Sequence, residues 1–135
     1  MILLDSSALV CALIGEPGAD ELRDLLEGAR AVAVGAPMVL EAGIVLAARG
    51  LDARHGLGGY LDAIEAEVLE FRKEHQSVAL GAFLRFGKGR HPAGLNYGDC
   101  MSYAFAQVTQ MTLAYKGEDF GQTDLKRLSR LGSRA

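Results

Sequence analysis

Three short stretches of the chain are mostly apolar and too short to form helices: residues 2–4, 32–34 and 111–115. Apolar runs of this length, bounded by polar residues or glycine, are typical of strands buried on both faces of a parallel sheet. The pattern therefore predicts three central strands. Residues 68–71 and the tail from Lys126 are weaker candidates for two more strands.

Between these stretches, apolar residues recur at the spacing of amphipathic or buried helices. Helices are predicted over residues 8–14, 19–27, 38–48, the early part of 60–71, 74–86 and 97–109, and a short helix or loop around Asp124. Helices that alternate with short buried strands indicate an α/β fold with a parallel sheet covered on both faces. We expect one domain over residues 1–135.

Composition narrows the class of protein. Half of the 135 residues are apolar and 23% are charged, which is typical of a globular chain rather than a disordered one. The net charge of −3 argues against binding nucleic acid by bulk electrostatics. Cys11 and Cys100 fall within predicted helices without a pairing pattern, so we expect small buried thiols in a cytoplasmic protein.

No secretory signal is expected, because Asp5 interrupts the apolar N-terminus and no basic region precedes it. Residues 31–48 resemble a membrane span, with Glu41 as the one charge. Gly35 and Pro37 lie in the middle of this stretch, so a strand, a turn and a helix explain it better.

Four acidic residues do not fit the charged faces of amphipathic helices. Asp5 directly follows the first predicted strand, where the ligand crevice of an open α/β sheet lies. An equally good interpretation is that Asp5 caps the following helix. Glu41 lies on an otherwise apolar helix, and a buried lone carboxylate costs several kcal/mol unless it is paired or binds metal.

Two further acids follow near the C-terminus. Asp99 lies in the first turn of the helix that Asn96 opens, where a capping role is a strong alternative to chemistry. Asp119 follows the strand that ends near Tyr115, and Asp124 is an accessory candidate five residues later.

Carboxylates that converge at one edge of a sheet repel one another, and Mg²⁺ or Mn²⁺ offsets that repulsion because these ions prefer oxygen ligands. Two such ions about 4 Å apart can activate water and stabilise the leaving oxygen in phosphodiester hydrolysis. The three histidines are scattered, so no zinc pattern competes. No Walker A or G-x-G-x-x-G loop follows a strand.

The chain resembles PIN-domain proteins, and more narrowly VapC-type toxin ribonucleases. The resemblance covers essentially the whole chain and rests on residues 2–9, Glu41, residues 87–100, residues 116–120 and residues 123–124. It implies a three-layer α/β/α domain whose acids hold Mg²⁺ or Mn²⁺. Carried over by position, the site comprises Asp5, Glu41, Asp99 and Asp119, with Asp124 as an accessory ligand and Ser7 as a hydrogen-bonding partner.

The resemblance also implies a metal-dependent endoribonuclease that acts as the toxin of a type II toxin–antitoxin system. It further implies a homodimer and inhibition by a VapB-type antitoxin. No association with a membrane is expected, because glycine and proline interrupt the apolar residues 31–48. A non-catalytic interaction module with the same fold is the alternative. A receiver or phosphatase domain fits less well, because a receiver needs paired acids after the first strand and a phosphatase needs an acid where Ser7 stands.

A basic segment precedes Asp99. Arg85, Lys88, Arg90 and His91 gather positive charge on a glycine-rich stretch, and we hypothesise that it contacts the RNA backbone. A solvated surface loop is an equal alternative, because basic surface clusters are common. Lys116 could likewise contact phosphate or pair with Asp119.

Overall fold

The computed structural model describes residues 1–132, so the last three residues of the predicted domain lie outside it. Its sheet has five parallel strands in the order β3-β2-β1-β4-β5. The strands are β1 Ile2–Leu4, β2 Val32–Gly35, β3 Glu67–Leu69, β4 Thr112–Tyr115 and β5 Leu128–Arg130. The parallel sheet and the edge strand near the C-terminus are therefore confirmed, and β3 begins one residue before its predicted start.

The first strand forms the centre of the sheet. Leu3 pairs with Ala33 of β2 on one side and with Leu113 of β4 on the other. Its side chain is 1% exposed, because helices cover both faces at this point. This burial on two faces is why the central strands read as apolar runs instead of alternating patterns.

Six helices and one 3₁₀ turn are described: α1 Ser6–Ile14, α2 Ala19–Glu27, α3 Ala36–Ala48, α4 Ala53–Ala63, α5 Lys73–Phe86, α6 Tyr97–Thr109 and η1 Phe120–Gln122. Most agree with the predicted ranges within two residues. Helix α4 differs, because it begins seven residues before Tyr60. The Asp52 side chain caps it by accepting a hydrogen bond from His55 N at 3.3 Å, which offsets the glycines that weaken the helical pattern.

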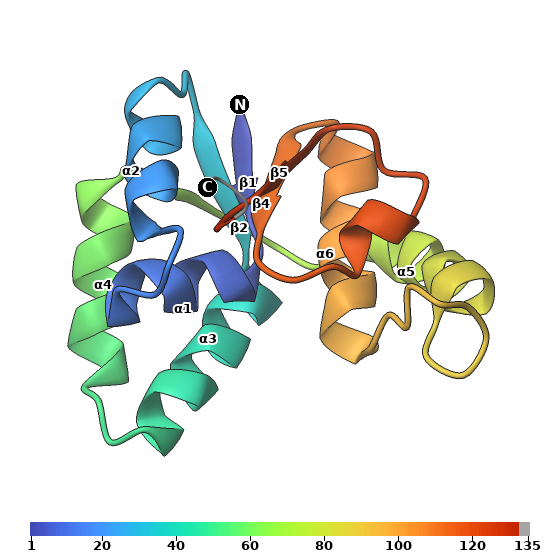
Figure 1. The fold of residues 1–135 in the computed structure, drawn as a ribbon, viewed down its shortest axis with the longest axis horizontal. Helices are drawn as coiled ribbons and strands as arrows, with labels where there is room; N and C mark the ends of the chain where they lie inside the picture. The colour runs from blue at the N-terminus through green and yellow to red at the C-terminus, as the bar shows by residue number, and fades with distance from the viewer. Residues whose placement is uncertain (133–135) are drawn as a thin grey trace.

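The elements form the expected three layers. Figure 1 shows α1, α2 and α4 on one side of the sheet and α5 and α6 on the other, with α3 reaching beyond the carboxyl ends of β1 and β2. Receiver domains of the flavodoxin-like type have the strand order 2-1-3-4-5. The order observed here is different, so the fold is not that of a receiver.

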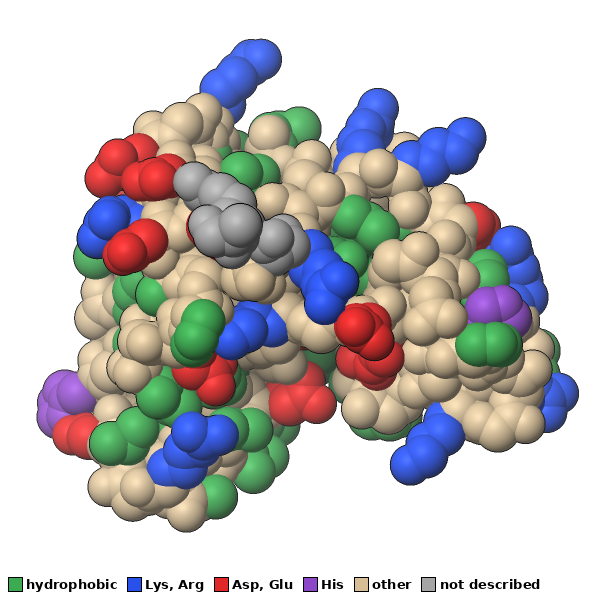
Figure 2. All heavy atoms as spheres, in the orientation of Figure 1, with side chains coloured by type: hydrophobic (Ala, Val, Ile, Leu, Met, Phe, Trp, Pro, Cys, Tyr) green, Lys and Arg blue, Asp and Glu red, His purple; other side chains and the backbone are tan. Residues whose placement is uncertain are grey.

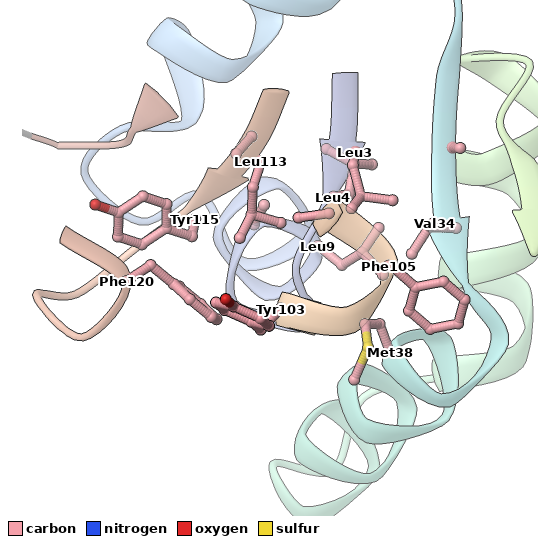
Figure 3. Packing of buried hydrophobic residues seen from close by; sticks show 14 of the residues in the cluster. Leu3, Leu4, Leu9, Val34, Met38, Tyr103, Phe105, Leu113, Tyr115 and Phe120 are labelled. Atoms are coloured by element: carbon pink, nitrogen blue, oxygen red, sulfur yellow. The ribbon is translucent and has the colours of Figure 1, made fainter. Parts of the chain in front are cut away.

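The core joins the two helical layers through the sheet. Phe105 of α6 is fully buried, and Figure 3 shows it beside Met38 and Val34. A Cβ added at Gly35 would lie 2.2 Å from the Phe105 ring, so only glycine allows this approach at the end of β2. Cys11 and Cys100 are buried and unpaired, as predicted.

Residues 31–48 form a strand and a helix, not one long apolar helix. Strand β2 occupies Val32–Gly35, and the 13-residue α3 begins at Ala36 with Pro37 in its first turn, as predicted. Within residues 1–132, no helix is long and apolar enough to span a membrane.

Candidate metal and catalytic site

The direction of chain progression reverses between β1 and β4. The first three strands run from the centre of the sheet to one edge, and β4 and β5 fill the other side. In open α/β sheets, ligands bind at this reversal, outside the carboxyl ends of the strands. Asp5 directly follows β1, and Asp119 lies on the segment that follows β4. The topology thus brings two predicted site residues to the expected crevice.

Asp5 is buried, with 4% of its surface exposed, and donors engage both of its oxygens. Oδ1 accepts a 2.5 Å hydrogen bond from the Ser102 hydroxyl. Oδ2 accepts from the Ser7 backbone nitrogen at 3.0 Å and from the Ser7 hydroxyl at 2.5 Å. Asp5 therefore caps α1, as one interpretation of the sequence held, and these bonds also fix its carboxylate at the crevice.

Glu41 lies half-buried on α3, where it meets two other elements. Its Oε1 accepts a 2.5 Å hydrogen bond from the Ser6 hydroxyl of α1. On α6, a Cβ added at Gly98 would lie 2.4 Å from Oε2. The Glu41 carboxylate is therefore not a lone charge in an apolar environment. The Ser6 hydroxyl donates to one of its oxygens, and Gly98 leaves room for the other.

Asp99 and Asn96 form a capping box at the start of α6. Asp99 Oδ2 accepts from Asn96 N at 3.1 Å, and Asn96 Oδ1 accepts from Asp99 N at 2.9 Å. Burial raises the pKa of Asp99 to about 6, against the lowering effect of the Asn96 hydrogen bond, and the charges of Asp5, Asp119 and Glu41 raise it further. The four predicted acids are therefore close enough to interact electrostatically.

Asp119 is exposed on the segment between β4 and β5. Asp124, the predicted accessory ligand, accepts hydrogen bonds from Tyr103 Oη at 2.6 Å and from Arg85 Nη2 at 3.1 Å. The structure therefore places Asp124 against α5 and α6, with donors on both of its oxygens.

The donor chemistry of the cluster suits a hard cation. Carboxylate oxygens are the preferred ligands of Mg²⁺ and Mn²⁺. A cation would relieve the repulsion that, in addition to burial, raises the pKa of Asp99. In residues 1–132, however, no three His, Cys, Asp or Glu side chains already converge as a coordinating group. Figure 2 shows a notch between two parts of the molecule, one that carries α1 to α4 and one that carries α5 and α6. Acidic side chains lie on both sides of this notch.

The predicted basic segment is more ordered than its glycine content suggested. Backbone hydrogen bonds from Lys88 N to Leu95 O and from Leu95 N to Phe86 O, both 2.9 Å, close it into a turn. The Arg90 guanidinium lies 5.8 Å from the Phe83 ring centroid.

Other predicted basic contacts have local partners. His91 Nδ1 accepts from Ala93 N at 3.0 Å, and Arg85 contacts Asp124 as described above. The Lys116 ammonium lies 3.9 Å from Glu16 Oε1, so its ion pair is with Glu16 and not with Asp119.

Sequence reasoning missed three residues that shape the site: Ser6, Gly98 and Ser102. Two of them could have been found from the helical spacing of residues in the sequence. Gly98 and Ser102 are four residues apart and therefore share the face of α6 that meets Glu41 and Asp5. The signal was a glycine and a serine on the same face of an apolar helix.

A cleft of about 800 Å³ lies elsewhere, between α2 and α4 near the amino-terminal ends of β2 and β3. Its lining includes Arg23, Glu27, Tyr60 and Glu67, and none of the four acids. The candidate site is therefore defined by its acidic side chains and not by this cleft.

The sequence matches the PIN domain family over residues 2–126. It is 44% identical over 127 residues to VapC ribonuclease Mb2004c of Mycobacterium bovis, covering 93% of this chain and 91% of the relative. It is 40% identical over 129 residues to Ribonuclease VapC of Mycolicibacterium smegmatis, covering 92% of this chain and 97% of the relative.

Solved structures show the same fold at low identity. A chain of VapBC2 from Rickettsia felis, bound to a DNA fragment from its promoter, superimposes with a TM-score of 0.77 at 15% identity. That match covers 97% of this chain and 99% of the other. VapC20 of Mycobacterium tuberculosis, described as a sarcin-ricin loop cleaving toxin, gives a TM-score of 0.73 at 15% identity, over 94% and 99% of the two chains.

Proposed function

Because this chain belongs to the PIN-domain family, and within it to the VapC ribonucleases, we propose that it is a metal-dependent endoribonuclease and the toxin of a type II toxin–antitoxin pair. The observation that carries the proposal is that separate elements bring acids together beyond the end of β1. Helix α6 carries Asp99, donates to Asp5 through Ser102 and meets Glu41 of α3 at Gly98. Four acids from separate elements would not be held this close for stability alone, since like charges repel.

The four acids would hold Mg²⁺ or Mn²⁺. A bound divalent ion supplies the charge stabilisation and the activated water that phosphodiester hydrolysis requires. Asp5 is suited to this role because Ser7 and Ser102 hold its carboxylate in one orientation. Small movements of the exposed Asp119 and the half-buried Glu41 would bring further oxygens to the ion.

The basic segment is our proposal for the RNA contact. Lys88 and Arg90 are exposed beside the start of α6, where phosphate groups near the acids would need countercharge. RNA binding is measured in an Asp99→Asn background, in which we expect no cleavage, and the double variant Lys88→Ala with Arg90→Ala should weaken it. In a chain that keeps Asp99, the same double variant should still be stabilised by Mn²⁺. Unchanged RNA affinity would leave the segment as an ordinary surface turn.

A matched control for this test is Arg49→Ala with Arg54→Ala. Both residues are exposed on the other helical part of the molecule, so they change the net charge equally. Loss of affinity in both double variants would indicate a bulk charge effect instead of a specific contact.

The chain's proposed partners are RNA in the cytoplasm, a VapB-type antitoxin and a second copy of itself. Leu80, Phe83 and Tyr97 line an apolar cleft of about 300 Å³ between α5 and α6. Leu80 is 55% and Tyr97 82% exposed, and apolar side chains that are exposed together in one cleft are typical of protein interaction sites. Sedimentation of the purified chain should show a dimer that Leu80→Glu dissociates.

The deciding experiment is cleavage of RNA with Mn²⁺ or Mg²⁺, with EDTA, and by Asp99→Asn. Cleavage that needs metal and disappears in the variant would support the proposal. Asp62→Asn, an exposed acid on α4, should retain activity. Absence of both cleavage and Mn²⁺-induced stabilisation would instead favour a non-catalytic interaction module, since only a ligand that binds the native state raises its stability.

A further inference from the structure

The segment between β4 and β5 carries Asp119 and is tied down on both sides of it. Before Asp119, the Lys116 backbone nitrogen donates to the Ser7 hydroxyl at 3.0 Å. After it, the Asp124 carboxylate accepts from Tyr103 of α6 at 2.6 Å and from Arg85 of α5 at 3.1 Å. Asp119 therefore lies between two attachment points.

The buried Phe120 provides a third attachment next to Asp119. It is 2% exposed, and its ring lies 5.2 Å from that of Tyr115 in an edge-to-face arrangement, visible in Figure 3. The Thr123 hydroxyl donates to Phe120 O at 2.7 Å and closes the turn. The backbone path from Asp119 to Asp124 is thus short and internally bonded, so a shift at Asp124 would be transmitted to Asp119.

The charge states at this junction favour a lasting hydrogen bond. Burial and the Asp124 contact raise the pKa of Tyr103 to about 12, so the phenol remains a donor. For Asp124, burial raises the pKa, but the hydrogen bonds from Tyr103 and Arg85 outweigh it and lower the pKa overall. Asp124 is therefore ionised at neutral pH, with its two oxygens already directed at these two donors.

We propose that Asp124 is a positioning residue, which Tyr103 and Arg85 hold so that the segment keeps Asp119 at the acidic cluster. This role replaces the accessory metal ligand that the sequence suggested. The acids whose charges act on Asp99 are Asp5, Asp119 and Glu41, and Asp124 is not among them. Its two oxygens instead face Tyr103 of α6 and Arg85 of α5, and a positioning residue keeps both of these contacts. This inference rests on the proposed metal-dependent function, because holding Asp119 in place matters only if Asp119 binds the ion. The contacts that hold the segment can nevertheless be tested without RNA.

The first test is Tyr103→Phe, which removes the hydroxyl and keeps the ring. Amide hydrogen exchange of residues 117–123 should become faster in the metal-free chain, because the later attachment point is weakened. The Mn²⁺ concentration at half-maximal thermal stabilisation should rise about tenfold, the lower end of the effect of losing a residue that orients a ligand. Tyr60→Phe on α4, remote from the segment, is the matched control and should change neither quantity.

A second pair of variants tests the ion pair. Arg85→Gln should produce a smaller change of the same kind, because its contact with Asp124 is partly exposed. Arg23→Gln removes the exposed pair with Asp20 on α2 and serves as its control.

Asp124→Asn separates the two roles. The amide oxygen can still accept from Tyr103, so a positioning role predicts a shift in Mn²⁺ midpoint no larger than that of Tyr103→Phe. A much larger shift for Asp124→Asn, with Tyr103→Phe unchanged, would establish Asp124 as a ligand and overturn the proposal. Unchanged exchange of residues 117–123 in Tyr103→Phe would overturn it as well, even if wild type cleaves no RNA.

Discussion

The charge of Asp99 should make the metal-free protein less stable than it could be. Burial and the nearby acids raise its pKa from 3.8 to about 6, so the folded chain favours the neutral carboxyl. Asp99→Asn removes the charge and keeps an oxygen that can accept from Asn96 N, so the capping interaction survives. We therefore expect a variant that loses activity and gains stability without metal.

The size of the gain follows from the pKa. The difference between 3.8 and about 6 corresponds to about 3 kcal/mol at neutral pH. The Asp99 carboxyl is partly solvated and some of the burial cost remains for the amide, so a gain of about 1–2 kcal/mol is realistic. For a chain of 135 residues this corresponds to a Tm increase of about 3–8 °C.

The gain must depend on pH in a fixed direction. Because the folded pKa exceeds the unfolded one, the contribution of Asp99 to stability is fully present below pH 3.8 and is lost as the pH rises through about 6. The difference in Tm between Asp99→Asn and wild type should therefore be largest at pH 7–8 and vanish near pH 4. Thermal unfolding by circular dichroism in EDTA measures it.

Adding Mn²⁺ should reverse the order of stability, because wild type gains from the bound ion and the variant gains little. Asp62→Asn controls for removal of an acid and should show neither effect. A Tm of Asp99→Asn equal to or below wild type at pH 7.5, or a difference that does not change with pH, would refute the electrostatic reasoning.

Three further outcomes are expected. Gly98→Ala places a Cβ 2.4 Å from Glu41 Oε2 and should displace this carboxylate, although alanine favours the helix more than glycine does. RNA cleavage in a metal-saturated assay should fall at least about tenfold. Ser102→Ala leaves Asp5 Oδ1 buried without its hydroxyl donor and should lower the free energy of unfolding by about 1–3 kcal/mol in urea titrations. Mn²⁺ affinity, measured by calorimetry, should fall below pH 6, where the ion competes with a proton on Asp99.

The sheet was predictable because its central strands carry one clear signal. Residues buried on both faces leave short apolar runs, and such runs marked β1, β2 and β4. The start of α4 was not predictable in the same way, because its first turns contain three glycines and the side chain of Asp52 supplies the cap. The exposed β3 lacks the apolar signal, since its position is set by pairing with β2.

The four acids were predicted from their positions along the chain, but the residues that hydrogen-bond or pack against them were not. Ser102 is a small polar residue in an apolar helix, and its meaning depends on Asp5, which is 97 residues away. Arg85 and Asp124, assigned separately to RNA and metal, contact each other. Sequence position cannot show such a contact, because it joins two elements that come together only in the folded chain.

Capping and chemistry appeared as alternatives for Asp5 and Asp99, yet the capping hydrogen bonds that the structure shows are compatible with the proposed metal site. The bond from Ser7 N to Asp5 Oδ2 starts α1 and also fixes the plane of the carboxylate beside the crevice. The bond from Asn96 N occupies Oδ2 of Asp99 in the same way. A carboxylate accepts up to about four hydrogen bonds or ligands, so a cap does not exhaust it. A helix that begins at the carboxyl end of a strand therefore supplies an oriented acid where the sheet opens, and metal ligands can be recruited from positions that folding already favours.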